Sequence, residues 1–145
     1  MDTYRIYLCG GMGKFGKENF DEGNLWRKYC QKVLESYECD LDVKAINPNR
    51  YFNFVDDPPR YKSDREVMDF DLNKVRHSDL VIVNFNDVYS LGSMFEMAIA
   101  YERRIPMIGL NETKEKLHKW QIEACTRIFD DIDEMLDYVE DFYLS

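Results

Sequence analysis

The strongest constraint on the fold is an alternation along the chain between short apolar runs and longer segments with helical periodicity. Each short run has the length of a buried strand, and each longer segment repeats its apolar residues every three or four positions. Strands that alternate with helices pair in parallel. The predicted strands are residues 5–9, 43–46, 80–84, 106–110 and 127–129, and the predicted helices are residues 24–36, 63 to about 78, 94–103 and 131 to about 143.

This order predicts an α/β fold, a flavodoxin- or Rossmann-like doubly wound sheet of about five mostly parallel strands with helices on both faces. The chain has 145 residues with neither a repeat nor a linker, so residues 1–145 are expected to form a single domain. Ligands of such sheets bind beyond the carboxyl ends of the strands. A site is therefore expected in residues 10–16, 47–61, 84–92 and the loop after Leu110.

Composition narrows the choice of partner and compartment. The formal net charge of -9 argues against a nucleic-acid polymer, which needs clustered Lys and Arg, and favours a small molecule. No apolar run approaches the ~20 residues of a membrane helix, so a cytoplasmic protein without membrane contact is expected. The 4 cysteines lack CxxC spacing and only 2 histidines accompany them, so we predict no metal site and no cofactor.

The glycines after the first predicted strand match two nucleotide-binding motifs, and both matches fail in context. Residues 11–16 fit GxGxxG, and residues 11–17 fit the start of a P-loop. A P-loop needs a hydroxyl after its lysine, where this chain has Glu18, and a dinucleotide site needs a helix that begins at the glycines, where polar residues follow Gly16. We expect a flexible glycine loop over a smaller ligand.

Two carboxylates stand where apolar residues are expected. Asp71 lies in the apolar stripe of Val67, Met68, Leu72 and Val75, and Glu96 is the one charge in residues 94–100. A buried carboxylate is costly unless it is paired or used. We place Glu96 in the first turn of its helix, where the helix dipole keeps it ionised and a credible nucleophile. The structural alternatives are that Asp71 reaches water past the sheet and that Glu96 only compensates the dipole.

Two carboxylates are also what cleavage of a glycosidic bond with retention requires. One attacks the anomeric carbon, and another acid protonates or holds the leaving group. The transition state resembles an oxocarbenium ion, which a fixed negative charge stabilises. Glu96 and Asp71 are the candidates for such a pair.

Four segments resemble the nucleoside 2-deoxyribosyltransferase superfamily, which includes the deoxynucleoside 5′-monophosphate N-glycosidases. They are residues 6–11 (IYLCGG), 71–73 (DLN) with 78–82 (SDLVI), 90–100 (SLGSMFEMAIA) and the strand at Pro106, and the similarity runs from Ile6 to about Tyr138. The resemblance implies cleavage of the N-glycosidic bond of a 2′-deoxyribonucleoside or its 5′-monophosphate through a glycosyl-enzyme intermediate. The deoxyribose then passes to another nucleobase.

The resemblance also implies roles for individual residues. Glu96 matches the family nucleophile, Asp71 the residue that assists the leaving base and orients the sugar, and Tyr7 a tyrosine at the floor of the site. Gly10 and Gly11 match the loop that lines the ligand, and Phe52, with Tyr51 and Phe54, is a candidate for stacking on a base. The residues expected to bind substrate are Gly10, Gly11, Asn47, Phe52, Ser90, Gly92 and His118.

Two positions bear on the 5′ group of the substrate. Ser90 stands where family transferases of free nucleosides carry Asp and the monophosphate glycosidases carry Ser, and a hydroxyl accepts a phosphate that an anion would repel. In the first loop, however, Gly13 stands where the monophosphate enzymes carry Arg, so phosphate binding would depend on Lys14, Lys17 or backbone amides. Both substrates remain open.

The segment around His118 bears on assembly. Residues 117–120 (LHKW) resemble a segment that, in many relatives, enters the active site of a neighbouring subunit. This match implies a homo-oligomer, a dimer or a trimer of dimers, in which His118 touches the 5′ end of a ligand bound to another copy. The plainer interpretation is an exposed helix residue.

Three alternatives stay open beside the transferase. A hydrolytic N-glycosidase differs only in passing the sugar to water, which a closed site would exclude. A non-catalytic, flavodoxin-like module that senses a nucleotide would use Glu96 only structurally. Attack on another N-glycoside, such as NAD or a modified nucleotide, is the third.

Overall fold

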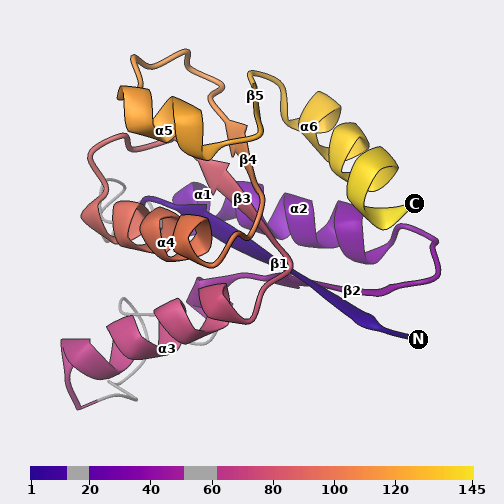
Figure 1. Ribbon diagram of the computed structural model, residues 1–145, viewed down its shortest axis with the longest axis horizontal. Helices are drawn as coiled ribbons and strands as arrows, with labels where there is room; N and C mark the ends of the chain where they lie inside the picture. The colour runs from indigo at the N-terminus through magenta and orange to yellow at the C-terminus, as the bar shows by residue number, and fades with distance from the viewer. Residues whose placement is uncertain (13–19, 51–61) are drawn as a thin grey trace.

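The computed structural model describes residues 1–12, 20–50 and 62–145, and in them the predicted sheet is present (Figure 1). All the paired strands run parallel, in the order β2-β1-β3-β4-β5. The predicted strand positions are confirmed, with ends that differ by two residues or fewer. The strands are β1 (Thr3–Gly10), β2 (Asp42–Ile46), β3 (Leu80–Asn84), β4 (Met107–Leu110) and β5 (Arg127–Phe129).

Helices cover both faces of the sheet, as predicted for a doubly wound fold. α2 and α6 lie against one face, and α3 and α4 lie against the other (Figure 1). The helices are α1 (Phe20–Gly23), α2 (Leu25–Glu35), α3 (Asp64–Arg76), α4 (Leu91–Glu102), α5 (Lys119–Ala124) and α6 (Ile132–Val139), with short turns at η2 (Pro48–Arg50) and η3 (Glu140–Leu144). Of these, α1, η2 and α5 were not predicted, because each has too few residues to display a helical period. In the described ranges, no helix has both the length and the apolar character that crossing a membrane requires.

The starts of α3 and α2 differ in how they are capped. At α3, the Ser63 hydroxyl accepts from the Glu66 N–H at 3.3 Å and the Glu66 carboxylate accepts from the Ser63 N–H, which together form a capping box. At α2, the side chain of the N-cap residue Asn24 makes no capping bond and accepts from Asn49 Nδ2 at 2.9 Å instead. The chain is already helical in α1, just before Asn24, so the side chain is free for another partner.

β1 separates the interior into two apolar clusters, because successive side chains of a strand point to opposite faces. Ile6 and Leu8 point toward α2 and α6, and Tyr7 and Cys9 point toward α3 and α4. All four side chains are 0% exposed. The face under α3 and α4 is therefore the one on which β1 carries polar groups.

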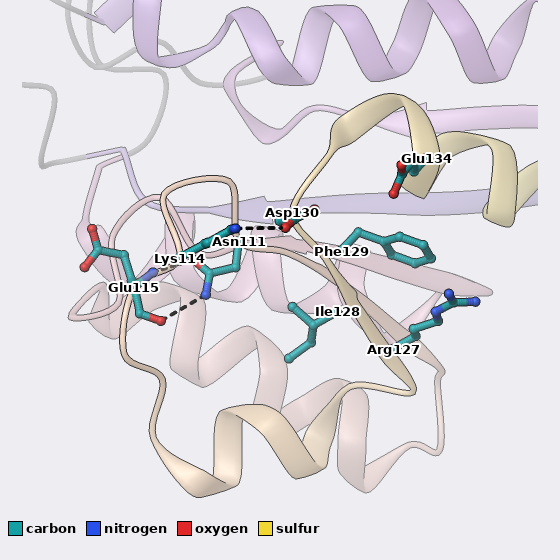
Figure 2. A pocket seen from close by; sticks show the side chains of 8 residues that line it. All are labelled: Asn111, Lys114, Glu115, Arg127, Ile128, Phe129, Asp130 and Glu134. Carbon is teal, nitrogen blue, oxygen red and sulfur yellow. Dashed lines mark hydrogen bonds and ion pairs between the residues drawn. The ribbon is translucent and has the colours of Figure 1, made fainter.

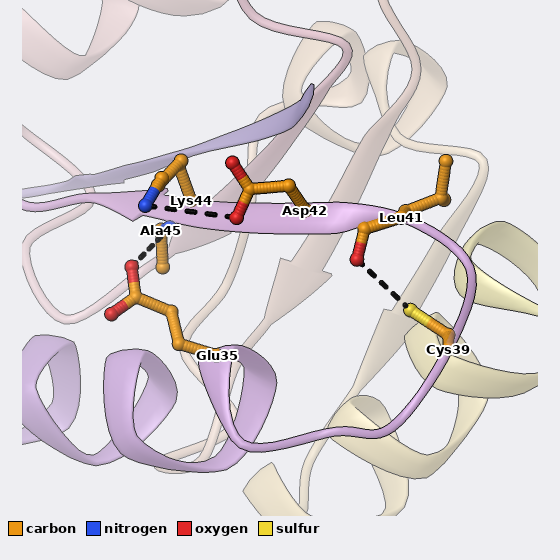
Figure 3. Close-up of polar contacts among 6 residues, drawn as sticks. All are labelled: Glu35, Cys39, Leu41, Asp42, Lys44 and Ala45. Atoms are coloured by element: carbon orange, nitrogen blue, oxygen red, sulfur yellow. Dashed lines mark hydrogen bonds and ion pairs between the residues drawn. The ribbon is translucent and has the colours of Figure 1, made fainter. Parts of the chain in front are cut away.

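The outer edge of β2 is closed by side chains of α2. Glu35 accepts from the Ala45 N–H at 2.8 Å (Figure 3), and Gln31 donates to the Ala45 carbonyl at 2.9 Å. These contacts occupy the backbone groups with which an edge strand could pair with another chain. They also hold the two elements in register, so that the carboxyl end of β2 lies beside that of β1.

Candidate active site

The strand order places a crevice between the carboxyl ends of β1 and β3. In this topology the chain leaves these two strands toward opposite sides of the sheet, which is where doubly wound folds bind ligands. The loops that follow the two strands touch, since Gly11 N donates to Asn86 Oδ1 at 3.0 Å and Asn86 Nδ2 donates to Gly11 O at 3.5 Å. A Cβ on Gly11 would lie 2.6 Å from the Cβ of Asp87, so only glycine fits this approach.

Glu96 faces this crevice from α4. Its helix buries Ser93, Met97 and Ala100, and Glu96 lies along the same side, next to Met97. The fully buried Tyr7 donates its hydroxyl proton to Glu96 Oε2. The structure thus brings two of the three predicted catalytic residues into direct contact across the interface between α4 and β1.

Cys9 is a second neighbour of Glu96, and the sequence analysis gave it no role at the site. It lies two residues beyond Tyr7 on the same face of β1, so its thiol is also directed at α4. The thiol donates to the Ser93 carbonyl oxygen, 3.8 Å from its sulfur, and its proximity to Glu96 lowers the pKa of that carboxyl. Tyr7 and Cys9 on one strand therefore both favour the ionised carboxylate.

The predicted placement of Glu96 in the first helical turn is wrong. α4 begins at Leu91, where the Ser90 hydroxyl caps it by accepting from the Ser93 N–H at 3.3 Å. Glu96 is the sixth helical residue, beyond the first turn in which the helix dipole acts on a charge. The apolar segment from Met94 concealed this earlier start, because Leu91, Gly92 and Ser93 carry no helical signal of their own.

Burial and hydrogen bonding act in opposite directions on Glu96. Burial raises the pKa of its carboxyl, while the bond from Tyr7, the nearby thiol of Cys9 and the charge of Arg27 lower it, and the net direction is upward. Burial and the neighbouring carboxylate Glu96 raise the pKa of Tyr7 and of Cys9 well above their usual values. Both groups therefore remain protonated donors, and they take the part that the sequence analysis gave to the dipole.

Asp71 approaches the same site from α3, which packs on α4. Leu72 and Val75 are buried beside it as predicted. Met68, in contrast, is 43% exposed and lies in the part of α3, residues 64–69, in which no residue is buried. Burial, and then the negative charge of Glu96, raise the pKa of Asp71 to about 7, and Arg27 opposes them. Asp71 is half-buried and electrostatically coupled to Glu96, so it does not simply reach past the sheet into water.

The predicted substrate-binding residues on the described elements differ in exposure. Ser90 is half-buried with its Oγ 2.9 Å from Ser93 Oγ, and Gly92 is exposed, with open space where a Cβ would stand. Asn47 is 3% exposed at the end of β2, where its Oδ1 accepts from the Asn49 N–H at 3.0 Å. Phe52 lies outside the described residues.

His118 is exposed and lies at the start of α5. Its Nδ1 accepts from the Trp120 N–H at 3.1 Å, and Gln121 Oε1 accepts from the His118 N–H at 2.7 Å. Gln121 in turn donates to the Val88 carbonyl at 3.2 Å, which ties α5 to the loop before α4. Within residues 1–12, 20–50 and 62–145, His118 forms no hydrogen bond with Tyr7, Asp71 or Glu96. Within one subunit, His118 is therefore an exposed residue at a helix start, which agrees with the plainer of the two predictions.

Arg27, like Cys9, is a residue near Glu96 that the sequence analysis missed. It is 1% exposed, and its guanidinium donates to the carbonyl oxygens of Leu8 and Gly10 at the end of β1. A signal for it was present, since Arg27 precedes the buried Cys30 by three positions and Leu34 by seven, which is the inward stripe of α2.

No group of three or more His, Cys, Asp or Glu side chains that could hold a metal ion occurs among the described residues. A hollow of about 410 Å³ lies at the carboxyl ends of β4 and β5, where Lys114 and Asp130 approach within 3.6 Å (Figure 2). Its lining contains both signs of charge and none of the predicted site residues.

Comparisons with known proteins extend the resemblance to the fold. No protein-family model matches the chain, and no curated protein matches its sequence. Solved structures do match over nearly its whole length. The 2-deoxyribosyltransferase from Bacillus psychrosaccharolyticus superposes with a TM-score of 0.66 at 18% identity, over 92% of this chain and 91% of that one. The enzyme of the same name from Leishmania mexicana gives 0.67 at 14%, over 97% and 99%.

A third solved structure, the CMP N-glycosidase of Clostridium botulinum, gives a TM-score of 0.50 at 18% identity, over 97% of this chain and 99% of that one. The chain thus has the fold that these glycosyl-transferring and glycosyl-hydrolysing enzymes share. Because the sequence identities are only 14–18%, what these three structures share with the chain is the fold.

Proposed function

We propose that this protein is a member of the nucleoside 2-deoxyribosyltransferase superfamily that cleaves the N-glycosidic bond of a 2′-deoxyribonucleoside or its 5′-monophosphate. Glu96 is the nucleophile, and the deoxyribose passes through a glycosyl-enzyme intermediate to another nucleobase. The observation that carries the proposal is the contact between Glu96 and the buried Tyr7 hydroxyl, with Asp71 as a second carboxylate that is electrostatically coupled to Glu96.

In the first step, an oxygen of the Glu96 carboxylate attacks C1′ of the deoxyribose. The C1′–O bond forms as the C1′–N bond breaks, and the electron pair of the broken bond goes to the base. Tyr7 occupies Oε2, so it fixes the carboxylate while Oε1 is directed at the sugar. The negative charge of Glu96 stabilises the oxocarbenium-like transition state before the new bond is complete.

Asp71 is the proposed general acid for the departing base. With a pKa of about 7, a large fraction of Asp71 carries a proton at neutral pH and can transfer it to the base nitrogen. The two carboxyl groups have separate tasks because their surroundings differ: Glu96 has two neighbouring donors that favour the anion, and Asp71 has a negative neighbour that disfavours it.

In the second step, a new acceptor attacks C1′ and releases Glu96. A second nucleobase loses its proton to Asp71 and receives the sugar, which completes a transfer. Water in the same place gives the hydrolytic alternative, an N-glycosidase, and the chemistry on the protein side is identical. The fold is shared with both kinds of enzyme.

Two further assignments belong to this proposal. Ser90 and the first turn of α4 receive the 5′ end of the substrate, where a hydroxyl beside backbone N–H groups accepts either a hydroxyl or a phosphate. His118 reaches the 5′ end of a ligand in a neighbouring copy, so the working enzyme is a homo-oligomer. The exposure of His118 and of Trp120, which is 81% exposed, leaves both side chains available to a second subunit.

The activity is tested by incubating the protein with deoxynucleosides and their 5′-monophosphates, each with and without a second free base, and separating the products by chromatography. A new nucleoside identifies the transferase, and free base without exchange identifies the N-glycosidase. NAD in the same panel covers other N-glycosides.

Glu96→Gln should lower kcat/KM by at least about a thousandfold, because the nucleophile is lost while the shape of the side chain is kept. Glu102→Gln, on the exposed end of the same helix, is the matched control and should leave kcat/KM unchanged. If no substrate releases base and Glu96→Gln leaves nucleotide affinity intact, a nucleotide-sensing module replaces the enzyme.

A further inference from the structure

α2 carries a buried cation on the face of the sheet opposite Glu96. Arg27 is 1% exposed and lies in the inward stripe of its helix with Cys30 and Leu34, where an apolar side chain would ordinarily pack. A buried guanidinium has lost its hydration, so it persists only where the protein supplies partners for it.

The guanidinium is anchored to the last residues of β1. Nε donates to Leu8 O at 3.1 Å and Nη2 donates to Gly10 O at 2.8 Å, while Cζ lies 4.8 Å from the centre of the Trp26 ring. A Cβ on Gly10 would lie 2.8 Å from Trp26 Cζ2 and 3.4 Å from Arg27 Nη2. The missing side chain at Gly10 therefore makes room for the Trp26 ring, which lies beside the Arg27 guanidinium at the end of the strand.

In the described part of the chain, the charge of Arg27 has no adjacent counter-ion. Among the residues that the structure describes, no carboxylate forms an ion pair with it, and Nη1 has no hydrogen-bond partner. The titratable groups that act on it are Cys9 and Tyr7 on β1, Glu96 on α4 and Asp71 on α3. In return, Arg27 lowers the pKa of both Glu96 and Asp71.

We infer that Arg27 is a positioning residue of the proposed active site: from behind the sheet it fixes the carboxyl end of β1 and supplies the positive charge that balances Glu96 and Asp71. The inference rests on the proposed function for its effect on catalysis, and its effect on the two carboxyl groups is independent of any substrate. Arg27 acts through the end of β1 and through its field, without touching the sugar.

The charge of Arg27 decides how many protons the two carboxyl groups hold. Both lie in a largely desolvated site, where two negative charges repel strongly. Arg27 lowers the pKa of both carboxyl groups, and so it favours the ionised Glu96 that nucleophilic attack needs. Without that charge, both groups take up protons at higher pH, and Glu96 is partly neutralised when it should attack.

The test compares Arg27→Gln, which removes the charge and keeps a donor for the carbonyl groups, with Arg27→Lys, which keeps the charge and loses the planar fork. Lys28→Gln is the matched control, since Lys28 is the next residue on α2 and is exposed. The carboxyl groups are titrated in the full-length, ligand-free protein by carbon NMR, and the kcat/KM of each folded variant is measured against pH.

Arg27→Gln should raise the pKa of Asp71 above about 7 and move the acid limb of the kcat/KM profile to higher pH. Arg27→Lys should leave the titration and the acid limb close to those of the native protein while lowering kcat, and Lys28→Gln should change neither. The inference is overturned if folded Arg27→Gln titrates like the native protein, or if Arg27→Lys shifts Asp71 as far as Arg27→Gln does.

The two proposals fail separately. If no substrate is cleaved, the NMR titration still shows whether Arg27 sets the protonation of Asp71 and Glu96. If the enzyme is active and the titration of Asp71 is the same in Arg27→Gln, the catalytic roles of Glu96 and Asp71 stand and the role of Arg27 is confined to packing at Gly10.

Discussion

The two faces of β1 show how one strand serves both stability and chemistry. Toward α2 and α6, Ile6 and Leu8 join an apolar cluster, and toward α3 and α4, Tyr7 and Cys9 meet Glu96. Both faces are fully buried, so exposure does not distinguish them. The difference is that Ile6 and Leu8 bring only hydrocarbon side chains to their face, whereas Tyr7 brings a donor whose partner is a carboxylate.

This difference shows which interactions offset the free-energy cost of burying the Glu96 carboxylate. Burying Glu96 raises its pKa, which means that the fold opposes its ionisation, and the donors on β1 counter that effect. The apolar face supplies the stability that allows such a group to be buried. Mutations on the two faces should therefore separate folding from function.

Leu8→Ala is expected to have the largest effect, and on stability alone. Removing a fully buried leucine side chain should lower the free energy of unfolding by about 3 kcal/mol, measured by urea denaturation. The titration of Asp71 by NMR should be unchanged, because the lost atoms point away from the carboxylates. A shift of that titration would show that the two faces are not independent.

Tyr7→Phe should act on the other face with an intermediate effect. Loss of a hydrogen bond to a charged group corresponds to about 2 kcal/mol, so kcat/KM should fall roughly tenfold to a hundredfold. Because that bond lowers the pKa of Glu96, its removal should also move the acid limb of the kcat/KM profile to higher pH. Tyr4→Phe, on the same strand but packed toward α2 and α6, is the control and should keep the native profile.

Asp71→Asn should have the smallest effect of the three substitutions. The effect is on the free energy of unfolding, and its size depends on pH. The pKa of Asp71 is raised to about 7 in the fold, so the folded state binds its proton more tightly than the unfolded chain does. Its contribution is therefore fully present below about pH 4 and is lost as the pH rises through 7. Because the group is partly solvated, we expect a difference of about 1 kcal/mol.

The measurement is the free energy of unfolding of the native protein and of Asp71→Asn at pH 4 and pH 8. The native protein should lose stability relative to the variant between these values, and Asp69→Asn, on the exposed side of α3, should follow the native protein. Equal pH dependence in the native protein and Asp71→Asn would contradict a raised pKa.

The five strands could be predicted from the sequence for one reason, and the grouping of Glu96, Tyr7 and Asp71 at one site for another. Strands are visible because their apolar runs are local. The site residues are visible because a charge within an apolar segment is conspicuous, and because the motifs around them resemble a family. The predicted first-turn position of Glu96 was wrong because the start of α4 depends on the cap at Ser90, which the pattern did not reveal.

The amino-acid order by itself determined the alternation of strands and helices, the parallel sheet, and which segments carry carboxylates, since these follow from periodicity and hydrophobicity within a few neighbouring residues. Only the tertiary structure decided that Cys9 joins Tyr7 beside Glu96, and that Arg27 binds the carbonyl groups at the end of β1 from behind the sheet. Those relations join residues on different elements. The protonation of a buried group depends on every charge and donor around it, and these gather only when the chain has folded.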